Sequence, residues 1–351
     1  MILTEGGLVK HIKNSSFEKV YFLYGEESYL SALYSRQIAS KIVGSHPLAE
    51  FNYQKLDGQS CTVGEIHDAV EALPVMAERK CVVVRDFDAA SAAADDIKQL
   101  SSLIQDLPES CVLVFWLDIV LADVKSNSKW KSFFSAVDKA GACVDFPRKS
   151  KSELVRLLCR EAQKRGCTLS PANAGLMVER AGDDLRLLMS ELEKLCALAA
   201  PGEIAREHIE SIGVLTIESS VYKLSTAILK GSYEEAYDIL NGLFAQREEP
   251  VWILAFLSNA YADLYRAKVA MAAGVRAETL AGDFSYRKST RLAIAARESR
   301  NIPLKLLRKS LDILAQADLK LKTTSANERT VLEQTAAKLI LLPRIEEEKS
   351  E

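Results

Sequence analysis

Two continuous apolar segments, residues 81–84 and 111–116, place the strongest constraint on how this chain can fold. Charged residues bound both segments, and neither alternates between apolar and polar positions as a half-buried strand does. Strands that are apolar throughout are typical of parallel sheets that helices cover on both faces. The two segments therefore predict the centre of a parallel sheet.

Three further segments in the same region predict strands, at residues 20–24, 51–56 and 143–146. The stretches between them show helical patterns, and Thr62 to Glu65 has the form of a capping box at the start of a helix. Five strands alternating with helices predict a doubly wound α/β domain over residues 1–146.

The sequence changes character at the polar, basic linker 147–152, beyond which the pattern is helical almost throughout. Residues 154–164, 171–179 and 184–198 predict a three-helix unit within a second domain, residues 147–212. Ser170 and Pro171 mark a helix start, and Gly182 with Asp183 is expected to end one helix and cap the next. A helical bundle is predicted over residues 213–342, followed by a frayed tail over residues 343–351.

The composition is that of a globular protein, with 48% hydrophobic and 26% charged residues. A net charge of -3 argues against a protein dedicated to coating nucleic acid, but it permits a local basic face. The cysteines form no C-x-x-C pair and the histidines are scattered, so no metal site is predicted. No segment is apolar for long enough to span a membrane and no signal peptide is recognisable, so a cytoplasmic location is expected.

The first predicted strand ends in a glycine and leads into a helix, as in a phosphate-binding P-loop. A P-loop has the form G-x-x-x-x-G-K-[ST], in which backbone amides and the lysine hold the phosphates. Here the loop is Gly25-Glu26-Glu27-Ser28, with no second glycine and no lysine before Lys41. Its two carboxylates would repel a triphosphate, and we expect them in the first turn of a helix, where negative charge suits the helix dipole. No nucleotide or other cofactor is predicted to bind.

Familiar catalytic motifs such as G-x-S-x-G and H-E-x-x-H do not occur. Asp86 and Asp88 follow the 81–84 strand, at the edge where α/β folds place their sites. Without a phosphate loop we expect both to be solvated loop residues. Asp118 follows the 111–116 strand and resembles a relic of the acid that holds magnesium in ATPases. The sequence predicts no catalytic residue and no autonomous catalysis.

Six blocks of the sequence, in order between residues 20 and 322, resemble the delta subunit family of bacterial clamp loaders. The most distinctive is Gly182-Asp183-Asp184-Leu185-Arg186, followed by the segment E-L-E-K-L at residues 191–195. The other blocks are residues 20–30, 73–84, 227–231, 249–254 and 317–322. Each block alone is a weak signal, and their common order makes the resemblance specific.

The resemblance implies an α/β AAA+-like domain with a degenerate P-loop fold, a small helical lid and an all-α collar. It implies a subunit of the DNA polymerase III holoenzyme that acts in DNA replication and is classed with the polymerase only through that membership. Such a subunit binds the ring-shaped sliding clamp (the beta subunit) and holds one interface open, while sister subunits hydrolyse ATP. The implied partners are the delta prime and tau/gamma subunits, met through the collar, and primer–template DNA within the complex.

In the family an apolar tip at the end of a helix engages the clamp. Carried over to this sequence, the tip is Leu73, Pro74, Val75 and Met76. Adjacent apolar side chains at an exposed turn can enter a groove, and methionine adapts to an imperfect pocket. Many relatives present aromatic residues there, and this tip has none. The alternative is that Val75 and Met76 pack into the core of their own domain.

Contact with DNA is suggested by two basic segments, the linker and a cluster between residues 287 and 309. The candidate residues are Arg148, Lys149, Lys151, Arg287, Lys288 and Arg291. The alternative is that these charges are solvated or face acidic neighbouring subunits.

Three other interpretations remain open at the level of sequence. A catalytically active AAA+ ATPase, such as a DNA-remodelling motor, would need a P-loop and an arginine finger near S-R-C, but Ser299-Arg300 is followed by Asn301. A delta prime subunit would show the same S-R-C motif and a zinc-binding cysteine group. A helical scaffold protein unrelated to replication would carry the N-terminal sheet as a passive domain.

Overall fold

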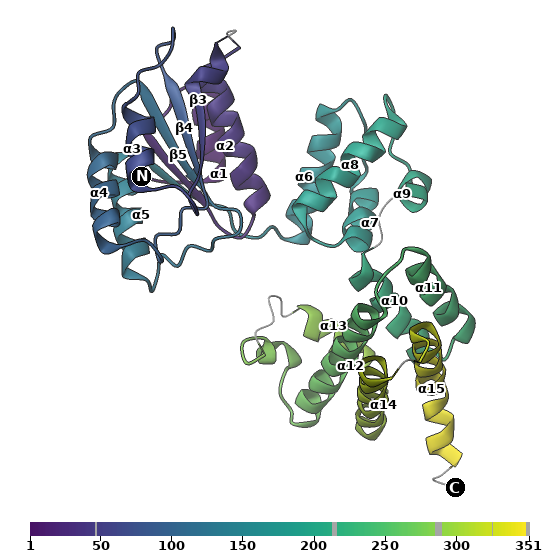
Figure 1. Cartoon of the computed structure of the whole chain (residues 1–351). Helices are drawn as coiled ribbons and strands as arrows, with labels where there is room; N and C mark the ends of the chain where they lie inside the picture. Colours follow the sequence, from purple (N-terminus) through teal and green to yellow (C-terminus); the bar gives the residue numbers. More distant parts are fainter. Residues whose placement is uncertain (46–47, 213–215, 285–289, 325, 349–351) are drawn as a thin grey trace. The chain divides into compact units, whose positions relative to one another are not determined.

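The computed structural model describes residues 1–45, 48–212, 216–284, 290–324 and 326–348 (Figure 1). The chain divides into two compact units, Met1–Leu154 and Val155–Glu351. The first unit is α/β and the second is helical, as the sequence predicts. The subdivision of the second unit into a lid and a collar remains a prediction.

A parallel sheet of six strands forms the centre of the first unit, in the order β1-β6-β2-β5-β4-β3. The strands are β1 (Ile2–Leu3), β2 (Val20–Tyr24), β3 (Tyr53–Asp57), β4 (Lys80–Arg85), β5 (Cys111–Trp116) and β6 (Ala142–Asp145). The prediction of five strands missed β1, because two residues that pair only with β6 at the sheet edge are too few to show a pattern. The two continuous apolar segments become β4 and β5, which lie side by side.

Helices cover both faces of this sheet. Figure 1 shows α1 and α2 on one side and α3, α4 and α5 on the other. Their bounds are α1 (Glu5–Asn14), α2 (Ser28–Val43), α3 (Val63–Glu71), α4 (Ala94–Gln105) and α5 (Ser128–Ala140). The predicted capping box is present at α3, where Thr62 Oγ1 accepts from the Glu65 amide and the Glu65 carboxylate accepts from the Thr62 amide. A short 3-10 helix, η1 (Ala49–Asn52), occupies residues predicted as the start of a strand, so β3 begins at Tyr53 instead.

Aromatic rings join the sheet to α5. Phe22 on β2 and Phe115 on β5 both pack against Phe133 of α5, with ring centroids 5.1 Å and 5.0 Å away. Trp130 lies 5.8 Å from Phe22, and all four side chains are almost completely buried. Such rings contribute large buried apolar areas, so this cluster anchors the face of the sheet that α5 covers.

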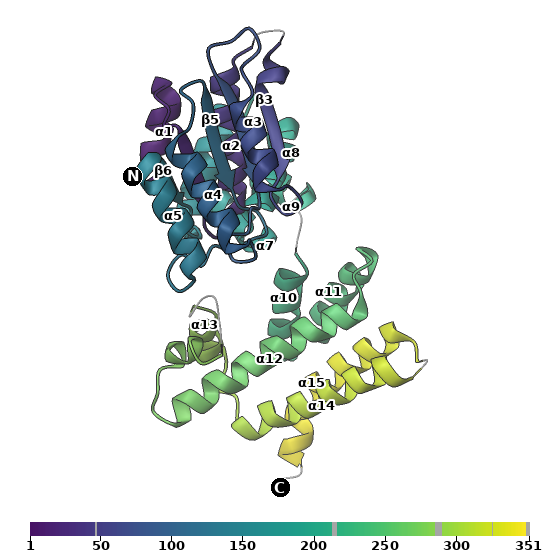
Figure 2. The same cartoon turned by 60° about the vertical axis from the view of Figure 1, so that its left-hand side comes forward.

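Helices make up the second unit in the part that the structure describes, apart from one isolated β-bridge between Thr168 and Glu203. Its elements are α6 (Lys151–Lys164), which begins in the first unit, α7 (Pro171–Ala181), α8 (Leu185–Ala199), α9 (Arg206–Ile212), α10 (Ile217–Leu229), α11 (Tyr233–Ala245), α12 (Pro250–Ala272), η2 (Ala277–Ala281), α13 (Thr290–Glu298), α14 (Leu304–Thr323) and α15 (Glu328–Glu348). Helices α10 to α15 share one apolar core, and α12, α14 and α15 lie side by side (Figure 2).

Three details differ from the sequence prediction. Asp184, not Asp183, caps α8, and its carboxylate accepts from the Leu187 amide. Helix α9 was not predicted. The segment expected to fray beyond Leu342 continues α15 to Glu348 with Pro343 inside the helix, and Glu346 pairs with Lys305 and Lys309 of α14.

Candidate functional site

The loop at Gly25 is shaped by close contact with the chain that follows β6. Gly25 has φ +124°, and a Cβ atom there would lie 2.5 Å from the carbonyl oxygen of Phe146. The Glu27 amide donates to that same oxygen at 2.9 Å. Helix α2 begins at Ser28 with Glu27 as its N-cap, so Glu26 and Glu27 precede the first turn in which they were expected. The glycine therefore serves backbone packing, which explains its presence without a phosphate.

Carboxylates surround this loop. The pKa of Asp145, at the end of β6, is raised first by partial removal from solvent and then by the negative charge of Glu26, while Lys125 acts in the opposite direction. Glu27, in the loop itself, is buried. An added phosphate would meet this negative potential without the lysine that a P-loop supplies. That the loop holds no nucleotide remains a prediction.

Asp86 has a different role from the one expected of it, because it is buried and not solvated. It has φ +54°, and its Oδ1 accepts from the amides of Asp118, Ile119 and Val120 at 2.7, 3.0 and 3.2 Å. A buried carboxylate that accepts several backbone amides is well satisfied and fixes the segment that donates them. Asp86 thus ties the end of β4 to the loop after β5.

The neighbouring acids have local partners. Asp118 Oδ2 accepts from Arg85 Nη2 at 3.1 Å, and the Arg85 Nε donates to Asp86. Asp88 accepts from the Ala90 amide within its own turn. Asp118, the suggested relic of a magnesium-binding acid, is therefore part of an ion-pair network. Among the described residues, no group of three or more His, Cys, Asp or Glu side chains could hold a metal ion.

The predicted tip follows α3 and is exposed. Leu73 and Met76 each expose 83% of their surface and Val75 exposes 42%, while Pro74 is half-buried. Met76 adopts φ +48°, which an unbranched residue tolerates better than a β-branched one. These values exclude the alternative that Val75 and Met76 pack into the core of the domain.

Asn52 holds the tip from the side. Its side chain is buried, its Nδ2 donates to the Val75 carbonyl at 2.9 Å, and its Oδ1 accepts from the Val75 amide at 2.7 Å. One amide group therefore satisfies both backbone groups of Val75, as a neighbouring strand would. The pairing fixes the backbone of the tip and leaves the Val75 side chain toward solvent.

Lys80, the first residue of β4, holds the end of α3 from which the tip projects. Its Nζ donates to the carbonyl oxygens of Ala69, at 2.6 Å, and Ala72, at the C-terminal end of α3. A cation at that end also interacts favourably with the helix dipole. Burial lowers the pKa of Lys80. The helix end that carries the tip is therefore attached to the sheet.

Replacing Asn52 by alanine should loosen the tip without unfolding the domain. Two hydrogen bonds are lost, so we expect the Val75 amide to exchange with solvent about thirtyfold faster, corresponding to ~2 kcal/mol of local opening. Hydrogen exchange followed by mass spectrometry measures this, with the peptide that covers α4 as an internal control. Unchanged exchange at the tip would contradict the role assigned to Asn52.

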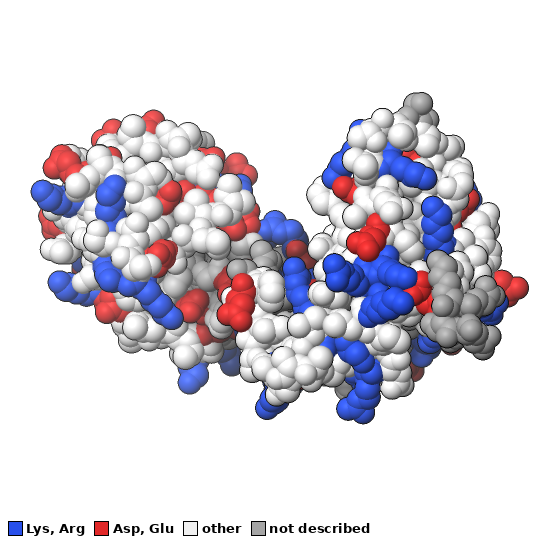
Figure 3. All heavy atoms as spheres, turned by 90° about the horizontal axis from the view of Figure 1, so that it is seen from below, with Lys and Arg blue, Asp and Glu red and all other residues white. Residues whose placement is uncertain are grey.

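The basic candidates for DNA contact have protein partners where the structure describes them. Lys149 Nζ pairs with Glu5 Oε2 at 2.6 Å, and Arg291 pairs with the buried Asp263 of α12. Arg148 and Lys151 also take part in interactions within the chain. Arg287 and Lys288 lie outside the described residues. On the face drawn in Figure 3, Lys and Arg side chains gather with acidic side chains among them. Contact of these residues with DNA remains a prediction.

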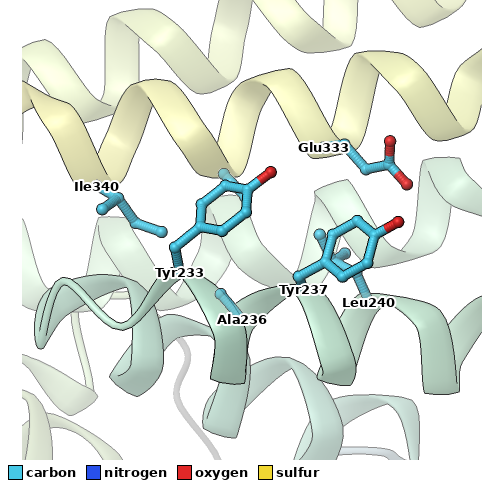
Figure 4. A pocket seen from close by; sticks show the side chains of 7 residues that line it. Tyr233, Ala236, Tyr237, Leu240, Glu333 and Ile340 are labelled. Atoms are coloured by element: carbon cyan, nitrogen blue, oxygen red, sulfur yellow. The ribbon is translucent and has the colours of Figure 1, made fainter.

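A shallow hollow lies between α11 and α15 (Figure 4). Tyr233 and Tyr237 stack along one side, with ring centroids 6.2 Å apart, and Ile340 lies opposite them. Glu333 contributes the one carboxylate of the lining and accepts from Arg329 Nε at 2.9 Å. The hollow is thus lined mainly by apolar and aromatic groups, and its carboxylate is already paired.

Comparison with known proteins settles the family. The family model described as DNA polymerase III, delta subunit, matches residues 21–136, and a second model, for the C-terminal domain of the delta subunit, matches residues 218–339. The chain belongs to the DNA polymerase III delta subunit family.

Two members of this family show how far the sequences of the family diverge. DNA polymerase III subunit delta of Bacillus subtilis is 22% identical over 327 residues, which cover 92% of this chain and 93% of the relative. The probable delta subunit of Aquifex aeolicus is also 22% identical, over 72% of this chain and 71% of its own.

The fold of a solved delta-family protein matches almost the full length of the chain. The solved structure of the Bacillus subtilis DNA clamp loader delta protein matches with a TM-score of 0.68 at 21% identity, and the match covers 95% of this chain and 98% of that one. This likeness supports the α/β unit and the helical remainder together.

The described part of the chain has no helix that is both long enough and apolar enough to cross a membrane.

Sequence reasoning missed Asn52 and Lys80, which position the tip of this delta-family chain, and it assigned Asp86, which positions the loop after β5, to solvent. Lys80 and Asp86 stand at or beside the ends of β4, next to continuous apolar residues, and such a placement hints at burial. No local signal indicates their partners, because the Asn52–Val75 contact joins residues 23 positions apart and the Asp86 contacts span more than 30.

Proposed function

We propose that this member of the delta family is a clamp-loader subunit that binds the sliding clamp through its apolar tip, residues 73–76. The observation that carries the proposal is the exposure of Leu73, Val75 and Met76 on a backbone held by the buried side chains of Asn52 and Lys80. Apolar side chains held out in this way give up no packing within their own domain when they enter a groove, although they lose some rotamer freedom. Each would gain about 1.5–3 kcal/mol if fully buried there.

The tip is pre-organised for docking, because its backbone needs little further ordering on binding. A ligand shifts a conformational equilibrium only by its differential affinity for the two states. A tip that fits the groove better when a clamp interface is parted would therefore hold that interface open without chemistry of its own. ATP hydrolysis is assigned to sister subunits, in agreement with the carboxylate-rich loop at Gly25.

The proposed partners follow from the same assignment. The delta prime and tau/gamma subunits would contact the helical unit, and primer–template DNA would pass through the assembled loader. The Bacillus subtilis protein of matching fold is named a DNA clamp loader delta protein, which supports the assignment at the level of the family.

The decisive experiment measures binding of the purified full-length chain to the sliding clamp of the same organism by surface plasmon resonance. The Val75→Ala/Met76→Ala double variant should raise the Kd about thirtyfold, because two apolar side chains at the centre of the contact are shortened. The hydrogen bonds from Asn52 go to the Val75 backbone and do not depend on the two side chains, so we expect the fold of the tip to be kept in this variant.

The matched control is Ile119→Ala/Leu121→Ala. These two residues are 65% and 76% exposed in the same unit, but they follow β5 at the opposite edge of the sheet from the tip. Their variant should bind like the wild-type chain. Absence of binding by the wild-type chain would overturn the proposed function, whereas equal binding by the tip variant would overturn only the site.

A further inference from the structure

One large apolar side chain in a segment adjacent to the tip is mostly exposed to solvent. Phe51, in η1, exposes 71% of its surface, although its neighbour Asn52 is buried. A single exposed apolar residue is ordinary on a protein surface. Phe51 differs because three further exposed apolar side chains, Leu73, Val75 and Met76, belong to the adjacent segment.

The sheet places Phe51 and the tip at the same edge. Strands β3 and β4 are parallel neighbours with Tyr53 opposite Cys81, so the segments entering them arrive side by side at the amino edge. Phe51 lies two positions before Tyr53, and the tip lies in the segment that enters β4. The side chain of Asn52 reaches across to the Val75 backbone, and the Phe51 Cα is one peptide, ~3.8 Å, from that of Asn52.

We propose that Phe51 is a further contact to the sliding clamp and that, with Leu73, Val75 and Met76, it forms one docking patch. This inference rests on the proposed function of the tip. Continuity with the tip identifies the occupant, because any partner seated on Val75 and Met76 lies beside the segment that Asn52 joins to them. The clamp would receive the patch in an apolar groove that is wider than the four tip residues alone would need.

The chemistry of the tip supports this assignment. Leu73, Val75 and Met76 include no aromatic side chain, whereas aromatic residues are enriched in the buried centres of interfaces. Phe51 supplies a rigid ring from a neighbouring segment, at a small cost in conformational entropy on binding. Asn52 then has two functions. It fixes the tip backbone, and it sets the position of the Phe51 segment relative to the tip.

Phe51→Ala should raise the Kd for the sliding clamp about tenfold in the full-length chain. Because the side chain is exposed, the variant should keep the thermal unfolding midpoint of the wild-type chain. Leu121→Ala, which removes an equally exposed side chain at the opposite edge of the sheet, should leave the Kd unchanged. Wild-type affinity in Phe51→Ala overturns the inference while the tip result stands, and no binding by the wild-type chain overturns the proposed function itself.

A second variant tests directly whether position 51 is buried when the sliding clamp binds. Phe51→Trp should keep the affinity within about threefold, since the larger ring can serve the same groove. It is studied in a Trp252→Phe background, because Trp252 is 60% exposed and would contribute to the signal. On addition of the sliding clamp its emission should shift to the blue, as expected for a ring that leaves water. A spectrum that does not move under saturating clamp would contradict burial of this position.

Discussion

Gly25→Ala is expected to lower the free energy of unfolding of the chain's first unit by about 4 kcal/mol, through strain at a positive φ and a steric clash. The added Cβ would lie 2.5 Å from the Phe146 carbonyl oxygen and 2.6 Å from Asp145 Oδ1. The obstructing atom is backbone at the end of a buried strand, so it cannot rotate away as a surface side chain would. Urea unfolding followed by tryptophan fluorescence measures the loss, in a Trp252→Phe background that leaves only Trp116 and Trp130 of the first unit.

Gly44→Ala separates the two causes. Gly44 also has a positive φ, +66°, but a Cβ atom there would meet nothing within 4 Å. Only the conformational penalty remains in this variant, about 2 kcal/mol, because ψ -157° places Gly44 in a backbone region that is nearly restricted to glycine. If Gly25→Ala and Gly44→Ala lower the free energy of unfolding equally, the close approach of Phe146 is not the reason that position 25 requires glycine.

Asp86→Ala is expected to destabilise the same unit by about 3 kcal/mol, because three backbone amides lose a charged acceptor inside the protein. Arg85 loses one of its two carboxylate partners as well. The loop after β5 should then open locally, which hydrogen exchange at the amides of Ile119 and Val120 would detect. The global loss is measured by the same urea experiment in the Trp252→Phe background.

Two variants define the role of the Asp86 charge. Asp86→Asn keeps the shape and tolerates the positive φ, so we expect about half of the loss. Asp88→Ala removes a neighbouring carboxylate whose acceptor contacts lie within its own turn, and about 1 kcal/mol or less is expected. A loss in Asp86→Ala no larger than that in Asp88→Ala would contradict the role of Asp86 as the tie between β4 and the following loop.

Much of the fold was predictable because it follows from local patterns. The continuous apolar residues of β4 and β5 could be buried only in a sheet covered on both faces, and the capping box at Thr62 specified the start of α3. The prediction failed where the local pattern was very short, or where it fitted two kinds of structure equally well. Two residues of β1 pair only through β6, and the apolar character of Phe51 suited a strand as well as an exposed turn.

The candidate site was predictable only in part. The four tip residues came from the family resemblance, and their positions in sequence do not show whether Val75 faces water or the core. Exposure depends on Asn52 and Lys80, which reach the tip from another segment and from the strand that follows. Asp86 was assigned to solvent because the chain has no phosphate loop for it to serve, but it is buried and accepts from three amides of a loop more than 30 residues away.

The sequence by itself determined that the loop at Gly25 lacks the lysine and the second glycine of a phosphate site, since residue identities alone decide which charges are present. It also determined an α/β unit followed by helices, because the periodicity of apolar residues is a local property. Only the tertiary structure decided that Gly25 is required by Phe146, that Asp86 is buried, and that Phe51 lies at the same edge as the tip. These features arise from contacts between distant segments, which form only when the parallel strands bring their ends together.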